Sequence, residues 1–429
     1  MALRQIAGQK ICILTPGHLS TNPRLVKEAD ALAEAGYDVQ VIAADFIAWA
    51  RNEDRSFKDR PWNKSPKLQF GPDAPFRTRA IQALRQQAAR QMVGAGVRWP
   101  SLVQGARHPI THDLIAAAKR VSADLYIAHY TAALPAAAIA ARHRGGLYAF
   151  DAEDFHPGDW PFGPSHAVER DRLRMIEERY LPGCAYVTAA SPGIAKAYAD
   201  TYGIRKPEVL LNVFPLSHAP SGPTQSGTTQ PGPSLYWFSQ TIGPDRGLEC
   251  AVRAIRLASS KPHLYLRGNP SAGFAELLYG IASDCGVKDR MHLLPPATPS
   301  EMERLAAAYD VGLAGETGHT QNRQIALTNK LFSYLLAGIP ALLSDIPAHR
   351  AFACDAGPAV HLYAVDDPAS LAKAVDRLLS DTATLAATRA AAFSLGQARF
   401  NWDYEKAVLL KTVSKALNSS LLLNASRHN

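Results

Sequence analysis

The fold is decided by the stretch Thr328-Asn329-Lys330-Leu331-Phe332-Ser333-Tyr334-Leu335-Leu336-Ala337-Gly338-Ile339-Pro340. Its spacing of apolar residues predicts a helix that ends at Gly338, and Pro340 opens a hydrophobic strand behind it. The first amide groups of this helix and the ammonium group of Lys330 favour an anion such as a phosphate or a diphosphate. A capped core helix without a ligand is the alternative interpretation.

Short apolar runs alternate with longer amphipathic runs along the whole chain, which indicates parallel sheets covered by helices. The strands expected in the first half are residues 11–15, 39–44, 125–128, 147–151, 186–190 and 209–211. Those expected in the second half are residues 235–238, 264–266, 292–294, 311–314, 341–343 and 359–362. Neither half has G-x-G-x-x-G after a strand, which argues against a nicotinamide or flavin dehydrogenase.

Two α/β domains of similar size account for this pattern. The first is expected over residues 1–213, joined by a terminal helix within residues 401–429, and the second over residues 234–400. Residues 214–233 between them are rich in Pro, Gly, Ser, Thr and Gln, which predicts a linker or a mobile loop.

Charge is unevenly distributed along the chain. The net charge is +8, and residues 51–107 alone hold twelve Lys and Arg against four Asp and Glu. Arginines alternate with apolar residues over 76–99, which predicts a basic amphipathic helix. An anionic partner, either a membrane surface or a lipid-diphosphate acceptor, is one interpretation, and a solvated helix face is the other. No motif resembles a nucleic-acid-binding module.

Several classes of protein are excluded by composition. No apolar run reaches the roughly 18–20 residues that span a bilayer, and no signal-peptide core precedes the first strand, so we expect a cytoplasmic protein. The five cysteines are scattered and the histidines are not paired at ligand spacing, so we expect free thiols and no metal.

Polar residues follow the expected strands of the first half, where open α/β sheets place their ligands. After the first strand, Gly17 allows close approach to a ligand, and the next positions offer hydrogen-bonding side chains. We count His18, Ser20, Asn22 and Arg24 as acceptor-binding. A turn with an N-cap is the alternative.

Three candidates for acid–base chemistry follow the next two strands of that half. They are His129 and the carboxylates Asp151 and Glu153. Neighbouring carboxylates raise one another's pKa, as a general base requires. A structural histidine and a solvated acidic turn are the alternatives.

The second half has two comparable loops. One follows the strand at 235–238 and contains Gln240, Gly243 and Arg246, which could hold a diphosphate. The other contains Glu316 and a long polar stretch over 317–324, and it ends at Thr328, before the helix expected over Asn329 to Ala337. Simple surface loops are the alternative.

Taken together, these residues resemble a GT-B glycosyltransferase, in particular the large bacterial group similar to family 4. The resemblance spans nearly the whole chain and rests on the order and spacing of several motifs. They are Ser20-x-Asn22-Pro23-Arg24 with Glu28, Asp124 with His129, Asp151-x-Glu153, Gly243 with Arg246-Gly247, and Asn329-Lys330-Leu331-Phe332-x-Tyr334 with Gly338-x-Pro340.

The resemblance implies two Rossmann-like domains facing a central cleft, with a C-terminal helix, here residues 402–417, that crosses back to the first domain. It implies an acceptor in the first domain and a UDP- or GDP-linked sugar in the second, with no other cofactor. By position, Gly17 approaches the donor, His129 faces the sugar, and Arg246 and Lys330 pair with the diphosphate.

The chain also departs from that family. Many members carry two glutamates that would fall at Ile325 and Ser333, and a second basic residue that would fall near Gln240. We therefore add further residues of this region to the expected donor site. They are Gln240, Gly243, Glu316, Thr328, Asn329 and Ser333.

The expected function is sugar transfer from a nucleotide-sugar to a glycan or lipid-linked acceptor in cell-surface polysaccharide or glycolipid synthesis. We expect a retaining, metal-independent hexosyltransferase in the cytoplasm, with peripheral attachment to the inner face of the cell membrane as an option. If it inverts, Asp151 or Glu153 is the expected base. The alternatives are a sugar-nucleotide 2-epimerase and a catalytically silent subunit that binds a nucleotide-sugar or a partner.

Overall fold

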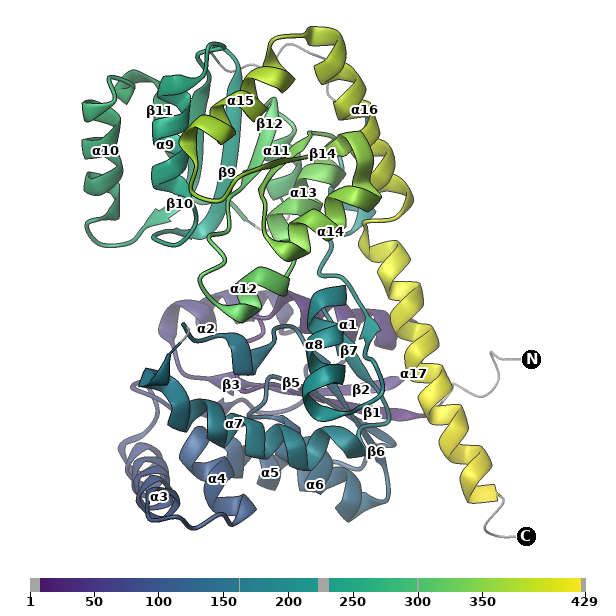
Figure 1. Ribbon diagram of the computed structural model, residues 1–429. Helices are drawn as coiled ribbons and strands as arrows, with labels where there is room; N and C mark the ends of the chain where they lie inside the picture. The colour runs from purple at the N-terminus through teal and green to yellow at the C-terminus, as the bar shows by residue number, and fades with distance from the viewer. Residues whose placement is uncertain (1–7, 162, 223–230, 299–300, 426–429) are drawn as a thin grey trace. The chain divides into compact units, whose positions relative to one another are not determined.

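The computed structural model describes residues 8–161, 163–222, 231–298 and 301–425, which form two compact units (Figure 1). Unit 1 contains the chain up to Leu210 and again from Lys406, and unit 2 runs from Leu211 to Glu405. Of the predicted linker over 214–233, residues 223–230 lie outside the described residues. Leu216–His218 form a short 3-10 helix within unit 2.

Unit 1 is built on a parallel sheet with the strand order β2-β1-β5-β6-β7-β8. Its strands are β1 (Lys10–Leu14), β2 (Asp38–Ile42), β5 (Leu125–His129), β6 (Leu147–Ala152), β7 (Val187–Ala189) and β8 (Glu208–Val209). Their apolar runs are buried on both faces, as parallel strands between helices require. The chain leaves β1 first toward β2 and later continues at β5, so the order reverses between β1 and β5.

Helices cover both faces of this sheet (Figure 1). They are α1 (Pro23–Glu34), α5 (Thr111–Arg120), α6 (Leu134–Arg144), α7 (Ala167–Tyr180) and α8 (Pro192–Tyr202). Three further helices, α2 (Ala48–Asp54), α3 (Phe76–Gly94) and α4 (Pro100–Arg107), follow β2 together with the two-stranded sheet of β3 (Ala44–Asp45) and β4 (Leu68–Gln69).

Unit 2 repeats this architecture with the order β11-β10-β9-β12-β13-β14, again parallel throughout. Its strands are β9 (Ser234–Ile242), β10 (His263–Pro270), β11 (Met291–Leu294), β12 (Val311–Ala314), β13 (Ala341–Ser344) and β14 (Val360–Tyr363). Its helices are α9 (Leu248–Leu257), α10 (Phe274–Asp284), α11 (Met302–Ala306), α12 (Gln321–Ile325), α13 (Asn329–Ala337), α14 (Pro347–Ala356), α15 (Pro368–Leu379) and α16 (Thr382–Ala398). Here the order reverses between β9 and β12.

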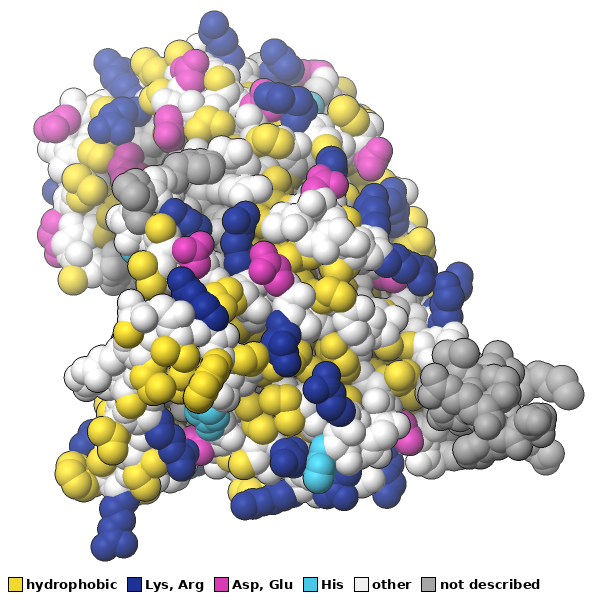
Figure 2. All heavy atoms as spheres, turned by 60° about the horizontal axis from the view of Figure 1, so that its bottom comes forward, with side chains coloured by type: hydrophobic (Ala, Val, Ile, Leu, Met, Phe, Trp, Pro, Cys, Tyr) yellow, Lys and Arg dark blue, Asp and Glu magenta, His cyan; other side chains and the backbone are white. Residues whose placement is uncertain are grey.

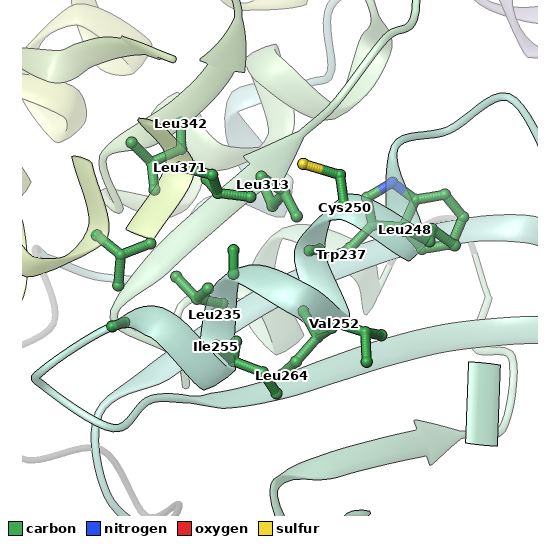
Figure 3. Close-up of a cluster of buried hydrophobic side chains, with 14 of the residues drawn as sticks. Leu235, Trp237, Leu248, Cys250, Val252, Ile255, Leu264, Leu313, Leu342 and Leu371 are labelled. Atoms are coloured by element: carbon green, nitrogen blue, oxygen red, sulfur yellow. The ribbon is translucent and has the colours of Figure 1, made fainter. Parts of the chain in front are cut away.

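The core of unit 2 lies between its sheet and the helices α9, α10 and α15 (Figure 3). Leu235 and Trp237 of β9 pack there against Leu248 and Ile255 of α9, and each of these side chains is almost fully buried. Burial of one such side chain stabilises the fold by about 1.5–3 kcal/mol. This face therefore fixes β9, from which one of the polar loops departs.

The predicted α/β class and the twelve main strands are confirmed, but the helices around residues 48–120 differ from the prediction. The amphipathic helix expected over 76–99 is shorter than predicted: α3 ends at Gly94, and a separate helix, α4, begins at Pro100, beyond the expected range. A proline suits the first turn of a helix, where its missing N–H is not needed. The last helix, expected to end at 417, continues to Ala425 as α17 (Trp402–Ala425) and passes from unit 2 into unit 1. Within the described ranges, no helix has the length and hydrophobicity needed to cross a bilayer.

Candidate functional site

Two polar loops of unit 2 leave the sheet at the point where the strand order reverses. One follows β9 and the other follows β12, and ligands of open α/β sheets bind at such a point. The two loops pass close together, because a Cβ atom on Gly247 would lie 3.2 Å from the carbonyl oxygen of Gly315. Gly247 also has φ +66°, which favours glycine, and the preceding loop residue Asp245 has φ +60°. The site-bearing loop is thus held in a sparsely populated conformation.

The start of α13 presents an ammonium group on a rigid support. Lys330 is 8% exposed, and its Nζ lies 5.2 Å from the centre of the Trp237 ring. Its Nζ also donates to Thr328 Oγ1 at 3.4 Å, so that this oxygen does not cap the helix. Burial lowers the pKa of Lys330, with Glu316 opposing this effect and the guanidinium groups of Arg246 and Arg323 adding to it, so that the pKa is about 8.

Three cations surround one carboxylate at this position. Arg246 Nη1 lies 3.9 Å from Glu316 Oε1, and Arg323 Nη1 lies 3.3 Å from Glu316 Oε2. Lys330 is electrostatically coupled to all three of these groups. We call Arg246, Glu316, Arg323 and Lys330 the cation cluster. Its local charge is positive by two when all four groups are ionised, which suits a multiply charged anion.

The backbone of Glu316 is held by the side chain of Ser344. Its backbone N–H donates to Ser344 Oγ at 2.8 Å, and that hydroxyl donates to the Glu316 carbonyl oxygen at 2.7 Å. Arg323 is placed by α12, whose N-cap Thr320 accepts the Arg323 N–H at 3.1 Å. The loop over 317–324, expected to be polar and long, therefore contains a short capped helix that delivers a third cation.

The other residues predicted for the donor site are dispersed. Gly243 lies in the β9–α9 loop near Ser271, while Gln240 and Asn329 are exposed at the end of β9 and at the first position of α13. Ser333 is fully buried and donates to Glu303 Oε1 of α11 at 2.7 Å. The second oxygen of Glu303 lies 3.3 Å from His218 Nδ1. The structure therefore puts a carboxylate of another helix beside the position where the family commonly carries its own.

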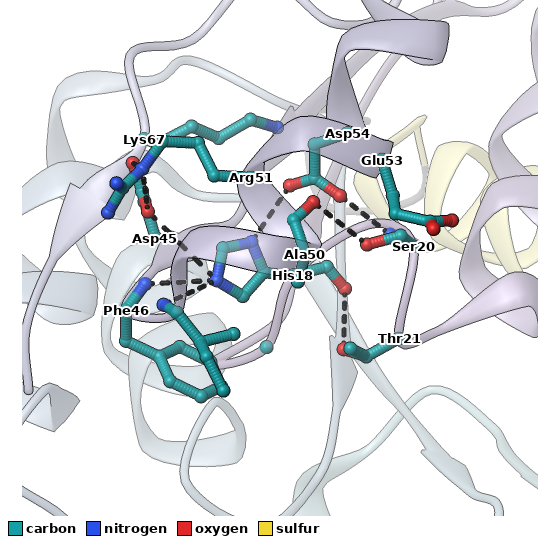
Figure 4. A network of polar contacts seen from close by, with 12 residues as sticks. His18, Ser20, Thr21, Asp45, Phe46, Ala50, Arg51, Glu53, Asp54 and Lys67 are labelled. Carbon is teal, nitrogen blue, oxygen red and sulfur yellow. Dashed lines mark hydrogen bonds and ion pairs between the residues drawn. The ribbon is translucent and has the colours of Figure 1, made fainter. Parts of the chain in front are cut away.

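In unit 1, the loop between β1 and α1 is braced by α2 (Figure 4). His18 Nδ1 lies 3.0 Å from Asp54 Oδ2, and its Nε2 accepts the N–H groups of Phe46 at 3.0 Å and Ile47 at 3.1 Å. Ser20 is held by the same carboxylate, since its N–H donates to Asp54 Oδ1 at 2.8 Å. Gly17, in this loop, donates its N–H to Thr15 Oγ1 at 3.1 Å.

Arg24 and Asp151 form a buried ion pair between α1 and β6. Arg24 Nε donates to Asp151 Oδ2 at 2.6 Å and its Nη2 to Oδ1 at 2.7 Å, while Nη1 donates to the carbonyl of Leu210 at 2.7 Å. Thr188 Oγ1 donates to Asp151 Oδ1 at 2.5 Å. Burial opposes ionisation of Asp151, but the guanidinium outweighs it and holds the pKa of Asp151 below its usual value.

His129 extends this buried network. Its Nε2 lies 2.6 Å from Glu28 Oε2, and its Nδ1 lies 3.4 Å from Asp151 Oδ2 and 3.5 Å from Asn22 Nδ2. Burial lowers its pKa, but the hydrogen bond to Glu28 and the negative charges of Asp151, Glu28 and Glu153 together outweigh that effect, so the pKa of His129 is raised overall. Asn22 at the same time caps α1, since its Oδ1 accepts the N–H of Leu25 at 3.0 Å. His129, Asp151, Asn22 and Arg24 thus come together, with their polar groups directed at one another.

Glu153 differs from Asp151 in its surroundings. It is half-buried two residues further along the chain, and burial raises its pKa despite the nearby Arg24. Tyr130, which follows β5, has φ +65°, an unusual value for a bulky residue, and its ring lies 6.1 Å from that of His156. Tyr130 also interacts electrostatically with Glu153. A carboxyl group of raised pKa near a residue of unusual backbone conformation is typical of a functional site.

Sequence reasoning missed Arg323, Trp237, Glu303 and Asp54. The Thr320 cap was a readable signal for the helix that carries Arg323. No local signal links Trp237 to Lys330 or Asp54 to His18, because these pairs are distant in sequence. Across the described chain, no group of three His, Cys, Asp or Glu side chains is arranged to hold a metal ion.

Replacement of Asp151 by Asn tests whether the buried pair is structural. We expect a loss of about 3–5 kcal/mol in the free energy of unfolding, since Arg24 would keep a buried, uncompensated charge. Asp200→Asn removes an exposed pair with Lys196 and should change stability by less than about 1 kcal/mol. Denaturant titration of both variants measures the difference, and an Asp151→Asn protein as stable as the wild type would contradict a structural role.

Comparison with known proteins places the fold. No protein-family model matches the chain, and no curated protein is significantly similar to it in sequence. Among solved structures, HepE from Anabaena in complex with UDP-glucose superposes with a TM-score of 0.68 at 16% identity, covering 95% of this chain and 99% of that one. Sucrose-phosphate synthase from Thermosynechococcus elongatus gives 0.70 at 14% identity, with 96% and 100% covered.

A third structure, WaaG, a glycosyltransferase involved in lipopolysaccharide biosynthesis, gives a TM-score of 0.58 at 12% identity, with 93% and 98% of the chains covered. Such identities establish a shared fold and leave membership in family 4 a prediction. The fold class expected from the sequence is confirmed: this chain has the GT-B fold of the glycosyltransferases.

Proposed function

We propose that the protein is a glycosyltransferase that takes a sugar from a nucleotide-sugar bound by unit 2. The observation that carries this proposal is the cation cluster at the start of α13, where Arg246, Arg323 and Lys330 share a single carboxylate. A departing nucleoside diphosphate develops negative charge, and fixed cations at a helix N-terminus stabilise it. The bound UDP-glucose of the HepE structure, which has the same fold, agrees with this choice of ligand.

Glu316 has a defined part in this proposal. In the free protein it holds the guanidinium groups of Arg246 and Arg323 near each other, at 3.9 Å and 3.3 Å from its two oxygens. A diphosphate that enters can take over these contacts without a large movement of the arginines. The three side-chain cations then supply the charge neutralisation, so that we propose a metal-independent reaction with a UDP- or GDP-linked donor.

We assign the acceptor, a glycan or a lipid-linked saccharide, to unit 1 and name Glu153 as its positioning carboxylate. Glu153 is preferred over Asp151 because the oxygens of Asp151 accept hydrogen bonds from Arg24 and Thr188, whereas the pKa of Glu153 is raised. With retention of configuration, which the family resemblance implies, a phosphate oxygen of the departing group accepts the proton and Glu153 orients the acceptor hydroxyl. A role in cell-surface polysaccharide or glycolipid synthesis follows from this acceptor class.

Thermal unfolding with a panel of UDP-, GDP-, ADP-, dTDP- and CMP-sugars tests the donor site. One nucleotide class should raise the unfolding temperature without added metal. Arg246→Gln and Lys330→Gln should each weaken its binding by about ten- to a hundred-fold, since each removes a charged hydrogen-bond donor. Arg253→Gln, an exposed arginine of the same unit, serves as the matched control. A folded protein that responds to none of these sugars contradicts the proposal.

The affinity for the nucleoside diphosphate of that class should depend on pH through Lys330. Its pKa is lowered to about 8 by burial, so the ammonium is charged below that pH and is lost above it. A bound anion raises this pKa, and affinity should therefore fall as the pH rises above about 8 and stay level below it. Calorimetric titration from pH 7 to 9.5 measures the slope. Lys330→Met should bind weakly at every pH, and an unchanged slope in that variant would assign the titration elsewhere.

Replacement of Glu153 separates a transferase from a silent subunit. Glu153→Gln should lower turnover by about a hundred-fold or more, because the acceptor loses its carboxylate partner. Its nucleotide-sugar affinity should stay within a few-fold of the wild type. A wild-type protein that binds the sugar donor but releases no nucleoside diphosphate with any acceptor would be a silent subunit. Interconversion of a UDP-sugar without acceptor would identify a 2-epimerase.

A further inference from the structure

Helix α3 displays large apolar side chains that the fold does not cover. Eleven large hydrophobic side chains are exposed among the described residues, and five of them lie between positions 76 and 99. They are Phe76, Ile81, Leu84, Met92 and Trp99, with exposed fractions of 76%, 50%, 72%, 40% and 66%. The interior receives only Gln82, Ala89 and Val93 from α3. The helix is therefore attached to unit 1 by a narrow seam and leaves most of its surface free.

Three of the exposed apolar side chains of α3 lie along one flank of the helix, beside its buried seam. At about 3.6 residues per turn, Ile81, Leu84 and Met92 fall within about 80° of one another, on a flank of the helix turned by roughly 100° from the buried Gln82 and Ala89. The buried side packs closely on α4, since a Cβ atom on Gly105 would lie 3.6 Å from the Cβ atom of Ala89. The orientation of the exposed apolar stripe is thus fixed by the packing of α3 on α4.

Arginines border this stripe. Between Asp73 and Asp113 the sequence has six arginines and neither aspartate nor glutamate. Arg79 and Arg90 donate to the backbone carbonyls of Pro72 and Ala106, contacts that leave their charge unneutralised, and Arg85 lies 3.7 Å from Asp113. Arg107 interacts electrostatically with Glu169 and two other carboxylates. Among the residues that the structure describes, Arg77 and Arg98 have no ion pair. Figure 2 shows dark-blue basic and yellow apolar side chains interspersed in its lower half, with few magenta acidic ones.

A pocket adjoins the end of this surface. It has a volume of about 390 Å³ and lies between α4 and α7, lined by Arg98, Val103, Met175, Glu178, Arg179 and other residues. Arg98, next to the exposed Trp99, contacts the Met175 sulfur at 3.8 Å. The pocket thus offers the guanidinium groups of Arg98 and Arg179, together with the carboxylate of Glu178, beside a few apolar side chains. Its net positive charge favours an anionic group such as a phosphate.

We propose that this face of unit 1, the α3 surface made of residues 76–99, docks on an anionic lipid bilayer. Its apolar stripe enters the interface between headgroups and acyl chains, while the bordering arginines contact lipid phosphates. The arginines indicate an anionic partner, because their charges are complementary to it. The exposed Ile81, Leu84 and Met92 favour a lipid bilayer over a nucleic acid, because a phosphate backbone offers no apolar contact to these side chains. This proposal does not depend on sugar transfer, because binding of the protein to vesicles is measured without a nucleotide-sugar donor.

Vesicle sedimentation with the full chain tests this proposal. At low salt the protein should bind vesicles of phosphatidylglycerol and phosphatidylcholine and bind pure phosphatidylcholine weakly. Arg77→Gln with Arg98→Gln should weaken binding to the anionic vesicles by about ten- to thirty-fold. Ile81→Ser with Leu84→Ser should abolish the binding that survives at high salt, because that part depends on buried apolar area.

Arg142→Gln with Arg253→Gln is the matched control, since both arginines are exposed and lie outside the α3 surface. It should bind like the wild type, and all variants should unfold at the same temperature. The proposal is overturned if the wild-type protein does not bind anionic vesicles. It is also overturned if the variant with Arg77→Gln and Arg98→Gln binds them as tightly as the wild type. Binding of a nucleic acid homopolymer without vesicle binding, or a dimer that Leu84→Glu dissociates, would assign the α3 surface to that other partner.

Discussion

Both units depend on one constraint of parallel sheets: all strands end at the same edge, so side chains that follow different strands are brought together there. In unit 2 this constraint joins the loop after β9 to the loop after β12, although Arg246 and Glu316 are far apart in sequence. In unit 1 it joins the loop after β1 to His129 after β5. The reversal of strand order decides which pair of loops faces each other, because the adjoining helices diverge at that point.

The two units use this edge in opposite ways. In unit 1 the guanidinium of Arg24 is matched by the carboxylate of Asp151, with additional hydrogen bonds from Thr188 and to the Leu210 carbonyl. Such a saturated network holds structure together and has little capacity for a further ion. In unit 2 Arg246 and Arg323 pair with Glu316, and Lys330 interacts electrostatically with the same carboxylate, which leaves an excess of positive charge that an additional anion can satisfy. The charges of the Arg24–Asp151 network are balanced, as in a structural ion pair, whereas the cation cluster has the excess positive charge expected of an anion-binding site.

The sequence was sufficient for the strands and for α13, because period and termination signals are local. It was also sufficient to predict that Arg246, Glu316 and Lys330 lie at the edge of the unit 2 sheet where the strands end. It could not decide which polar residues there point at a ligand and which at a neighbour, since Arg24 and Asp151 are separated by 127 positions and Ser333 and Glu303 by 30. The sequence does not reveal how deeply each polar side chain is buried. Asn22 and Arg24 have the donors of a binding residue, but each is 1% exposed. The sequence pattern over 76–99 predicted a helix there, but it did not predict that α3 ends at Gly94 and that a second helix begins at Pro100.

Helix α13 combines two tasks that proteins usually separate. Every residue from Lys330 to Ala337 is buried, so the charge at its start is positioned by the same packing that holds unit 2 together. The site is thereby preorganised, and little reorganisation energy is spent when an anion arrives. The two parts of the site also differ in how many substitutions they tolerate. Substitutions in α13 disturb the core, whereas substitutions in the loop that carries Arg323 do not. Diversification of ligand preference would therefore accumulate in that loop, with the anion-binding end kept constant.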